Sequence, residues 1–222
     1  MPSFLEKRKT CPKDLPGVDF LFVDDGSDDN AWEILQSRGI PYVRHEINLG
    51  QGIACNTGML AAIRLGYDVV ITMDGDGQHD FSDIPVFLQC METTDADIVV
   101  GSRILGSNHG DAAFVRRFFL PHVTWVVNRL SGYRLTDAMC GFRAYRVESL
   151  KRVVGELSNL MEGEYTAAEL FMRFGRAGLK VREVPVSLNN RIVGRSHKGM
   201  VKYGMGILRA IARTLMDRHY WR

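Results

Sequence analysis

The segment Asp74-Gly-Asp76-Gly-Gln78 holds the side chains of this sequence best suited to chemistry. It follows an apolar run at 67–73, and two carboxylates two residues apart at the end of a strand can point the same way. Mg²⁺ and Mn²⁺ prefer such hard oxygen ligands, and Mg²⁺ usually completes its shell with substrate phosphate oxygens. The pattern therefore predicts a Mg²⁺ or Mn²⁺ ion that joins the protein to a diphosphate.

Other interpretations of this segment fit less well. A simple Gly/Asp turn would leave three acids within residues 74–80 repelling one another unless a cation lies among them. A calcium-binding EF-hand needs Gly at its sixth position and Glu at its twelfth, where this chain has His79 and Pro85. Aspartyl phosphatases commonly carry Thr or Val where this chain has Gln78. We favour the metal site and keep the turn as its alternative.

Two further polar loops precede predicted helices. Asp24-Asp25-Gly26-Ser27 follows the apolar run at 18–23. Ser27 or Asp28 would suffice to cap the next helix, so capping does not explain the Asp pair before the glycine. An aspartate there would accept hydrogen bonds from a base N–H or a ribose hydroxyl. In Asn48-Leu-Gly50-Gln51-Gly52 the glycines either let a ligand approach a helix N-terminus or form a turn.

The elements that must position these loops alternate along the chain. Apolar runs predict strands over 18–23, 41–45, 67–73, 97–101 and 179–186. Amphipathic stretches predict helices over 30–38, 53–65, 82–91, 112–130, 165–177 and 198–216. This alternation predicts an α/β sandwich with a mostly parallel sheet, in which ligands bind beyond the carboxyl ends of the strands. The loops at 24–29, 74–80 and 101–103 would share that edge.

Length and composition exclude several classes of protein. The chain has 222 residues, 45% of them hydrophobic and 24% charged, which is ordinary for a globular domain. It has no apolar window of 18 residues and no signal-peptide pattern at its start. Its four cysteines form no CxxC pair, so we expect reduced structural residues and a cytoplasmic protein.

The charge is distributed unevenly. Residues 191–222 hold eight Lys or Arg and one acid, a net charge of +7, so the rest of the chain carries 20 basic and 25 acidic residues, or −5. An acidic body with a basic tail suggests that the tail meets an anionic partner. The tail lacks interleaved aromatic residues on a groove-like sheet, so we expect no nucleic-acid binding.

The predicted C-terminal helix is basic and amphipathic. Its apolar stripe holds Val201, Met205, Leu208, Ala212 and Leu215, and two aromatic residues, Tyr220 and Trp221, precede the last residue. Such a helix either lies in a membrane interface or packs on the domain with a solvated basic face. The apolar, Arg-bearing segment 114–130 is a second such surface. We therefore divide the chain into a domain over 1–197 and a helix over 198–222, and expect peripheral attachment to the cytoplasmic face of a membrane or to a membrane protein.

Six segments together resemble a known family. They are VDDGSDD (23–29), NLGQGIACNTG (48–58), MDGDGQHD (73–80), GSR (101–103), TDAMCGFRAY (136–145) and EVPVSLNNRIVGRSHK (183–198). In this order they resemble glycosyltransferase family 2, in its dolichyl-phosphate mannose synthase-like, or polyprenyl-phosphate sugar transferase, branch. The resemblance covers about residues 2–200. It implies the GT-A fold, a three-layer sandwich, here followed by the amphipathic helix.

The resemblance also implies roles for individual residues. The metal would be held by Asp76, with Asp74 and Gln78 beside it, and the nucleoside by Asp24 and Asp25. The donor or acceptor phosphates would meet Arg103, Arg191, Ser196 and Lys198, and the acceptor side would be lined by Asp137 and the segment Gly141-Phe142-Arg143. Gly50 and Gln51 would lie on the donor side, although many relatives carry Lys in place of Gln51.

The implied reaction moves a sugar from a nucleotide-diphosphate sugar to a polyprenyl phosphate, with inversion and with Mg²⁺ or Mn²⁺. A phosphate acceptor is already mostly a dianion at neutral pH and needs cations more than a base. A glycan hydroxyl acceptor would need a base, for which Asp137 is the first candidate and Glu164 the second. A third hypothesis is an inactive homologue that acts as a binding protein.

The chain departs from the family at its start. The family opens with a strand and a PxYNE-type loop, whereas residues 2–7 of this chain resemble the end of the family's first helix. The missing strand is central in the GT-A sheet. A longer native reading frame, a fragment and an incomplete sheet are the three explanations, and we favour the first.

Overall fold

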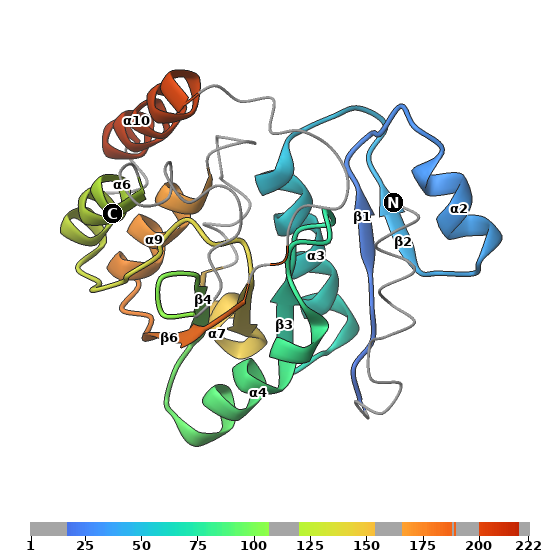
Figure 1. Cartoon of the computed structure of the whole chain (residues 1–222), viewed down its shortest axis with the longest axis horizontal. Coiled ribbons are helices and arrows are strands. Elements are labelled where there is room, and N and C mark those ends of the chain that lie inside the picture. Colours follow the sequence, from blue (N-terminus) through green and yellow to red (C-terminus); the bar gives the residue numbers. More distant parts are fainter. Residues whose placement is uncertain (1–16, 107–119, 154–165, 188, 190–199, 218–222) are drawn as a thin grey trace.

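The structure is a computed structural model that describes residues 17–106, 120–153, 166–187, 189 and 200–217 (Figure 1). Its strands are β1 (Phe22–Asp24), β2 (Tyr42–Arg44), β3 (Val69–Thr72), β4 (Ile98–Ser102), β5 (Arg143–Arg146) and β6 (Val181–Pro185). Its α-helices are α2 (Ala31–Ser37), α3 (Gln51–Leu65), α4 (Ile84–Thr93), α6 (Leu120–Ser131), α7 (Val147–Arg152), α9 (Thr166–Arg176) and α10 (Met200–Met216), and the 3₁₀ turn η2 (Phe81–Asp83) precedes α4.

The strands form two sheets. One has the order β3-β5-β4-β6, and the other is the parallel pair β1-β2. In the larger sheet β3, β4 and β6 run in one direction, but β5 lies between β3 and β4 and is antiparallel to both. The sheet is therefore mixed, whereas the sequence predicted a mostly parallel one.

That difference comes from β5. The sequence analysis predicted neither this strand nor the helix α7 that follows it. The strand is only four residues long and has arginine at both ends, so it gives no apolar run. Its first residue, Arg143, is nevertheless buried. The guanidinium of Arg143 lies over the Phe171 ring, 4.7 Å from the ring centroid. The five predicted strands and the described parts of the predicted helices are present, with shifted ends.

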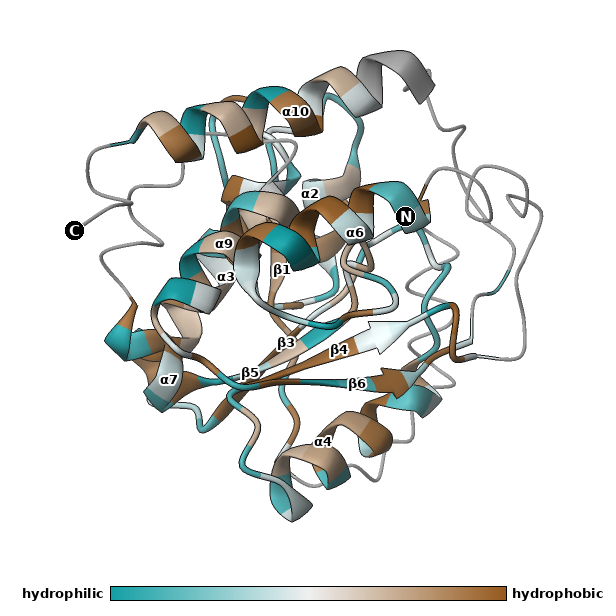
Figure 2. Cartoon of the chain, turned by 90° about the vertical axis from the view of Figure 1, so that its left-hand side faces the viewer, coloured by the Kyte–Doolittle hydropathy of each residue, from teal (hydrophilic) through white to brown (hydrophobic). Residues whose placement is uncertain are grey.

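The larger sheet lies between two layers of helices (Figure 2). All five residues of β4 are buried. Alternate side chains of this strand enter different cores: Ile98 and Val100 join Phe171 of α9, and Val99 joins Phe87 of α4. An alternation of this kind follows from the two-residue period of a strand. The predicted three-layer α/β arrangement is confirmed.

The C-terminal helix belongs to the larger of these cores. Ile207, Ala210 and Ile211 of α10 are buried in the same cluster as Phe171. Within the described residues, no helix has the length and apolar character needed to cross a membrane.

Candidate active site

The polar loops that follow β1 and β3 are joined by hydrogen bonds through the start of α3. Asp25, after β1, binds the backbone of Gly50, which immediately precedes α3. Gln51, the first residue of α3, donates a hydrogen bond to Asp74 after β3. Two of the three predicted loops are thus in contact, and Arg103 of the third, after β4, acts on Asp74 through its positive charge.

Asp74 is the centre of this cluster. Its Oδ1 accepts a hydrogen bond from Gln51 Nε2 at 2.5 Å, and its Oδ2 lies 3.7 Å from His79 Nε2. Burial raises the pKa of Asp74, but the contact with His79 and the positive charges of Arg143 and Arg103 outweigh it and lower the pKa overall. The Asp74 carboxylate is therefore held ionised, as a metal ligand must be.

Gly141 fixes the place of Asp74 from the other side. A Cβ atom on Gly141 would lie 2.7 Å from Asp74 Oδ1, which is closer than side chains approach one another. Only glycine at this position leaves the carboxylate where it lies in this structure. The two residues come from segments that are 67 positions apart in the sequence, so the TDAMCGFRAY segment closes one side of the acidic loop.

Asp76 and Gln78 form the outer part of the acidic loop. Asp76 Oδ1 accepts a hydrogen bond from the backbone N–H of Gln78 at 3.0 Å. No group of three or more Asp, Glu, His or Cys side chains that could hold a metal occurs among the residues the structure describes. A loop with two carboxylates fits Mg²⁺ or Mn²⁺ that takes most of its ligands from phosphate and water, and it does not fit a metal bound by protein ligands alone.

His79 is a member of the cluster that the sequence analysis passed over. It is buried, and its ring centroid lies 5.0 Å from that of Phe142. Its Nδ1 is a buried atom without a hydrogen-bond partner in the structure. Its position inside the motif DGDGQHD, next to the predicted ligands, was the available signal.

The aspartate pair at the end of β1 contacts protein groups. Asp24 is buried, and its Oδ2 lies 3.2 Å from Arg44 Nε. Asp25 accepts hydrogen bonds from the backbone N–H groups of Leu49 (3.0 Å) and Gly50 (2.7 Å) and lies 2.8 Å from His45 Nδ1. Asp25 thus holds the turn that leads into α3.

Arg103 and Asp137, predicted separately, form an ion pair. Arg103 Nε and Nη2 donate to the two carboxylate oxygens of Asp137 at 2.5 and 2.8 Å. Asp137 is buried, and its backbone N–H donates to Glu183 of β6 at 3.0 Å. In this conformation Asp137 positions the guanidinium of Arg103, and Glu183 is a supporting residue that sequence reasoning missed.

Arg143, predicted on the acceptor side, is buried beneath the site. Its guanidinium donates to the backbone carbonyls of Ala138 (3.0 Å) and Cys140 (2.7 Å), so it shapes the loop that carries Asp137. Burial raises the pKa of the Cys140 thiol to about 12 and that of Cys55 to about 11. Both thiols are therefore neutral at physiological pH.

The chain after β6 returns to the acidic loop. The backbone N–H of Asn189 donates to the carbonyl of Gln78 at 2.9 Å, and its side chain donates to Asp80 at 3.2 Å. Four predicted residues lie outside the described residues, namely Glu164, Arg191, Ser196 and Lys198.

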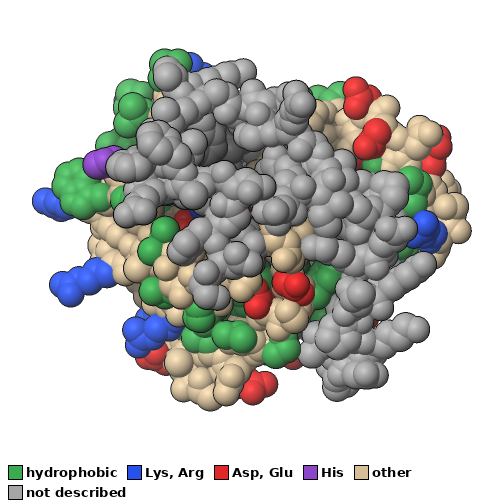
Figure 3. Space-filling view, in the orientation of Figure 1, with side chains coloured by type: hydrophobic (Ala, Val, Ile, Leu, Met, Phe, Trp, Pro, Cys, Tyr) green, Lys and Arg blue, Asp and Glu red, His purple; other side chains and the backbone are tan. Residues whose placement is uncertain are grey.

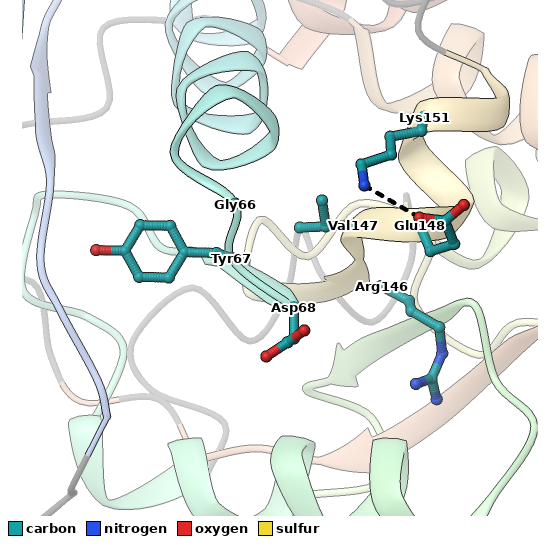
Figure 4. A pocket seen from close by; sticks show the side chains of 7 residues that line it. All are labelled: Gly66, Tyr67, Asp68, Arg146, Val147, Glu148 and Lys151. Atoms are coloured by element: carbon teal, nitrogen blue, oxygen red, sulfur yellow. Dashed lines mark hydrogen bonds and ion pairs between the residues drawn. The ribbon is translucent and has the colours of Figure 1, made fainter.

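A cavity of about 230 Å³ lies elsewhere, beside the start of β3 (Figure 4). It is lined by Gly66, Tyr67, Asp68, Arg146, Val147, Glu148 and Lys151. Its cations already have partners: Lys151 lies 3.1 Å from Glu148, and Arg146 donates to a backbone carbonyl at 2.8 Å. Because β3 separates this cavity from Asp74, it is not part of the acidic cluster.

Comparison with known proteins gives consistent matches. The family model described as "Glycosyl transferase family 2" matches residues 5–154. The undecaprenyl-phosphate mannosyltransferase of Micrococcus luteus is 30% identical over 189 residues, which are 82% of this chain and 76% of that protein. The UDP-N-acetylglucosamine–dolichyl-phosphate N-acetylglucosaminyltransferase of Methanococcus voltae is 29% identical over 184 residues, covering 75% of this chain and 72% of that protein.

The solved structures agree on the fold. Glucosyl-3-phosphoglycerate synthase from Mycobacterium tuberculosis, in complex with Mn²⁺, uridine diphosphate and glucosyl-3-phosphoglycerate, superposes with a TM-score of 0.62. The match covers 89% of this chain and 68% of the synthase, at 17% identity. At that identity the likeness concerns the fold alone, which is the predicted GT-A fold.

Proposed function

Because this chain belongs to glycosyl transferase family 2 and is a nucleotide-sugar-dependent glycosyltransferase, we propose that it transfers a sugar to a polyprenyl phosphate. The reaction inverts the anomeric carbon and depends on Mg²⁺ or Mn²⁺. The observation that carries the proposal is the acidic loop itself, in which Asp74 is held between Gln51 and Gly141 with Arg103 nearby. Two relatives named for sugar transfer to lipid phosphates support the acceptor class.

The donor diphosphate is placed at the acidic loop. Asp76 would hold the metal, with Asp74 and Gln78 beside it, and the bound ion would stabilise the negative charge of the departing diphosphate. The synthase of M. tuberculosis, which contains Mn²⁺ and uridine diphosphate in its structure, supports this placement. Asp24 and Asp25 would contact the nucleoside. Asp25 also orders the turn that brings Gln51 to Asp74.

The acceptor phosphate is placed at Arg103. An oxygen of the phosphate dianion attacks the anomeric carbon while the bond from that carbon to the diphosphate breaks, and the electron pair leaves with the nucleoside diphosphate. No proton has to be removed from the acceptor, so a base is not required. The Asp137 carboxylate is engaged by Arg103 in this conformation, which suits a cation-positioning role better than that of a base.

Three further predicted residues complete the phosphate site in this proposal. Arg191, Ser196 and Lys198 follow Asn189, whose contacts with Gln78 and Asp80 bring the chain to the acidic loop two residues before Arg191. Their cationic and hydroxyl groups would bind phosphate oxygens. Because the acceptor carries a polyprenyl chain, the enzyme works at the cytoplasmic face of a membrane. None of its described helices is long and apolar enough to cross that membrane.

Thermal denaturation with and without Mn²⁺, against a panel of UDP-, GDP- and dTDP-sugars, tests the donor part of the proposal. One nucleotide class should raise the melting temperature only with metal, because selective binding to the folded state stabilises it. A cooperative transition that no donor shifts would contradict a formed donor site. Loss of turnover in Asp137→Asn with donor binding kept, on a hydroxyl acceptor, would assign the acceptor to the hydroxyl class.

A further inference from the structure

Helix α10 has apolar side chains on two opposite faces. The inner face, with Ile207, Ala210 and Ile211, is buried against the core that α9 shares. The outer face carries Met205, Leu208 and Met216, which are 56%, 63% and 73% exposed. The predicted apolar stripe is therefore split, and its Met205 and Leu208 point away from the protein. A helix that only packs on a domain needs one apolar face.

Helix α6 continues this surface. Its described exposed residues are Pro121, His122, Trp125 and Arg129, and Trp125 is 67% exposed. Both α6 and α10 pack against α9. Figure 2 shows the two helices on the same side of the molecule, with α10 above α6. We call the exposed residues of both helices the docking face; it consists of Pro121, His122, Trp125, Arg129, Met205, Leu208, Arg209, Ala212, Arg213 and Met216.

The charges on the docking face have one sign. It contains Arg129, Arg209 and Arg213 together with His122, and no Asp or Glu among its described residues. Figure 3 shows hydrophobic, basic and histidine side chains together along the left edge of the molecule, over α6. Exposed large apolar residues beside cations are the composition of protein surfaces that bind the interface of an anionic bilayer.

The docking face is held rigidly to the domain. Arg173 of α9 is buried and binds Glu169 at 3.0 Å and Asp217 at 2.7 Å, and Asp217 directly follows α10. With the buried inner face, this ion network fixes the rotation of α10 about its own axis. The outer apolar side chains are thus presented outward without a conformational change.

We propose that the docking face binds the surface of an anionic phospholipid bilayer, with Trp125, Met205, Leu208 and Met216 entering the interface and the arginines contacting headgroups. This proposal rests on the proposed function, in which the acceptor is a lipid of the membrane. In Figure 1, α10 lies at the end of the molecule at which α3 begins, where Gln51 contacts Asp74. A bilayer at this face would bring a membrane-borne acceptor to the end of the fold that holds the site.

Vesicle flotation with the full chain tests the proposal. Wild-type protein should float with vesicles of phosphatidylglycerol and phosphatidylcholine and bind pure phosphatidylcholine more weakly. Leu208→Ser and Trp125→Ser should each reduce the bound fraction severalfold. Arg209→Glu should weaken binding to the anionic vesicles by at least about fivefold, since one basic residue near the surface contributes about that factor.

Matched controls come from the end of α3. Leu65 is 68% exposed and Arg64 precedes it, so Leu65→Ser and Arg64→Glu change the same residue types away from the docking face and should leave flotation unchanged. No flotation of the wild type, or equal losses in the controls, would overturn the proposal. So would a concentration-dependent dimer that Leu208→Ser dissociates, because the face would then bind a second copy. Metal-dependent donor binding, measured by the melting temperature, separates this failure from failure of the proposed function.

Discussion

The carboxylate of Asp74 connects more parts of the candidate site than any other side chain described above. It follows β3, accepts a hydrogen bond from α3, lies near a buried histidine and touches the glycine of a distant loop. The sequence predicted that this residue and Asp76 act together. It did not show which neighbours keep Asp74 ionised: His79 lies in the same loop but was given no role, and Arg143 and Arg103 come from distant segments.

Replacement of Asp76 by Asn tests the metal assignment. The amide keeps an oxygen for the Gln78 N–H but loses the charge, so the fold should remain while the metal-dependent rise in melting temperature with nucleotide disappears. We expect a loss of transfer rate on the order of a hundredfold, as for other lost electrostatic contacts to a leaving group. An unchanged metal-dependent shift would place the metal elsewhere.

Replacement of Gly141 by Ala tests the contact with Asp74. The added methyl group lies 2.7 Å from Asp74 Oδ1, so the carboxylate must move. We expect a stability loss of about 1–3 kcal/mol from overpacking and a rate loss on the order of a hundredfold from misplacement. Gly58→Ala in α3 is the control: its Cβ meets only Val23 at 3.7 Å, and alanine there should stabilise the helix by about 0.5–1 kcal/mol. Full activity of Gly141→Ala would contradict the assigned place of Asp74.

Asp25 gives a pH-dependent prediction. Burial raises its pKa, but the hydrogen bonds from His45, Leu49 and Gly50 outweigh burial and lower the pKa below 3.8. A lowered pKa in the folded state stabilises the protein above about pH 4 and stops doing so as the pH falls through the folded value. Asp25→Asn should therefore be less stable than wild type at pH 7, and the difference should shrink in acid. Denaturant titrations at several pH values measure this, and a constant difference would contradict it.

At the residue level, spacing and residue type predicted the loop cluster but not the partners inside it. The paired acids at the ends of two strands and the glycines at the start of α3 were visible in the sequence. The Arg103–Asp137 pair was not, because 34 positions separate the two residues and only the fold joins them. Arg143 resembled a substrate contact, but it binds carbonyls of its own loop.

At the scale of elements, periodic segments were predicted and β5 was missed. Continuous apolar runs identify β3 and β4, since helices cover both faces of these strands. In β5 the aliphatic parts and the cation of Arg143 are buried by stacking on a ring, so polarity in the sequence does not report exposure in the fold. The same strand makes the sheet mixed.

The buried ion pair inside α9, whose Arg173 also binds Asp217 after α10, is testable at this scale. Arg173→Met leaves Glu169 buried without its cation, which should cost about 3–5 kcal/mol of stability. The double variant Glu169→Gln with Arg173→Met also removes the Glu169 charge and should recover much of that loss. Denaturant unfolding of both variants measures the difference, and equal stability of the two would contradict the role of Arg173 in compensating the buried Glu169 charge.

At the scale of the whole molecule, elements beyond the family model support both the candidate site and the docking face. The family model ends at residue 154, so α9, β6 and α10 lie beyond it. These elements supply Glu183, which binds the backbone N–H of Asp137, and the apolar outer face of α10. The sequence predicted a basic amphipathic C-terminal helix, but the rotation that turns Leu208 outward depends on packing against α9.

The most direct test of the account is transfer of labelled sugar, with the donor identified by thermal denaturation, to a polyprenyl phosphate and to the matching polyprenol. The account predicts a glycolipid product from the phosphate alone, formed only with Mg²⁺ or Mn²⁺ and lost in Asp76→Asn. Transfer to the polyprenol or to a glycan hydroxyl, but not to the polyprenyl phosphate, would contradict it.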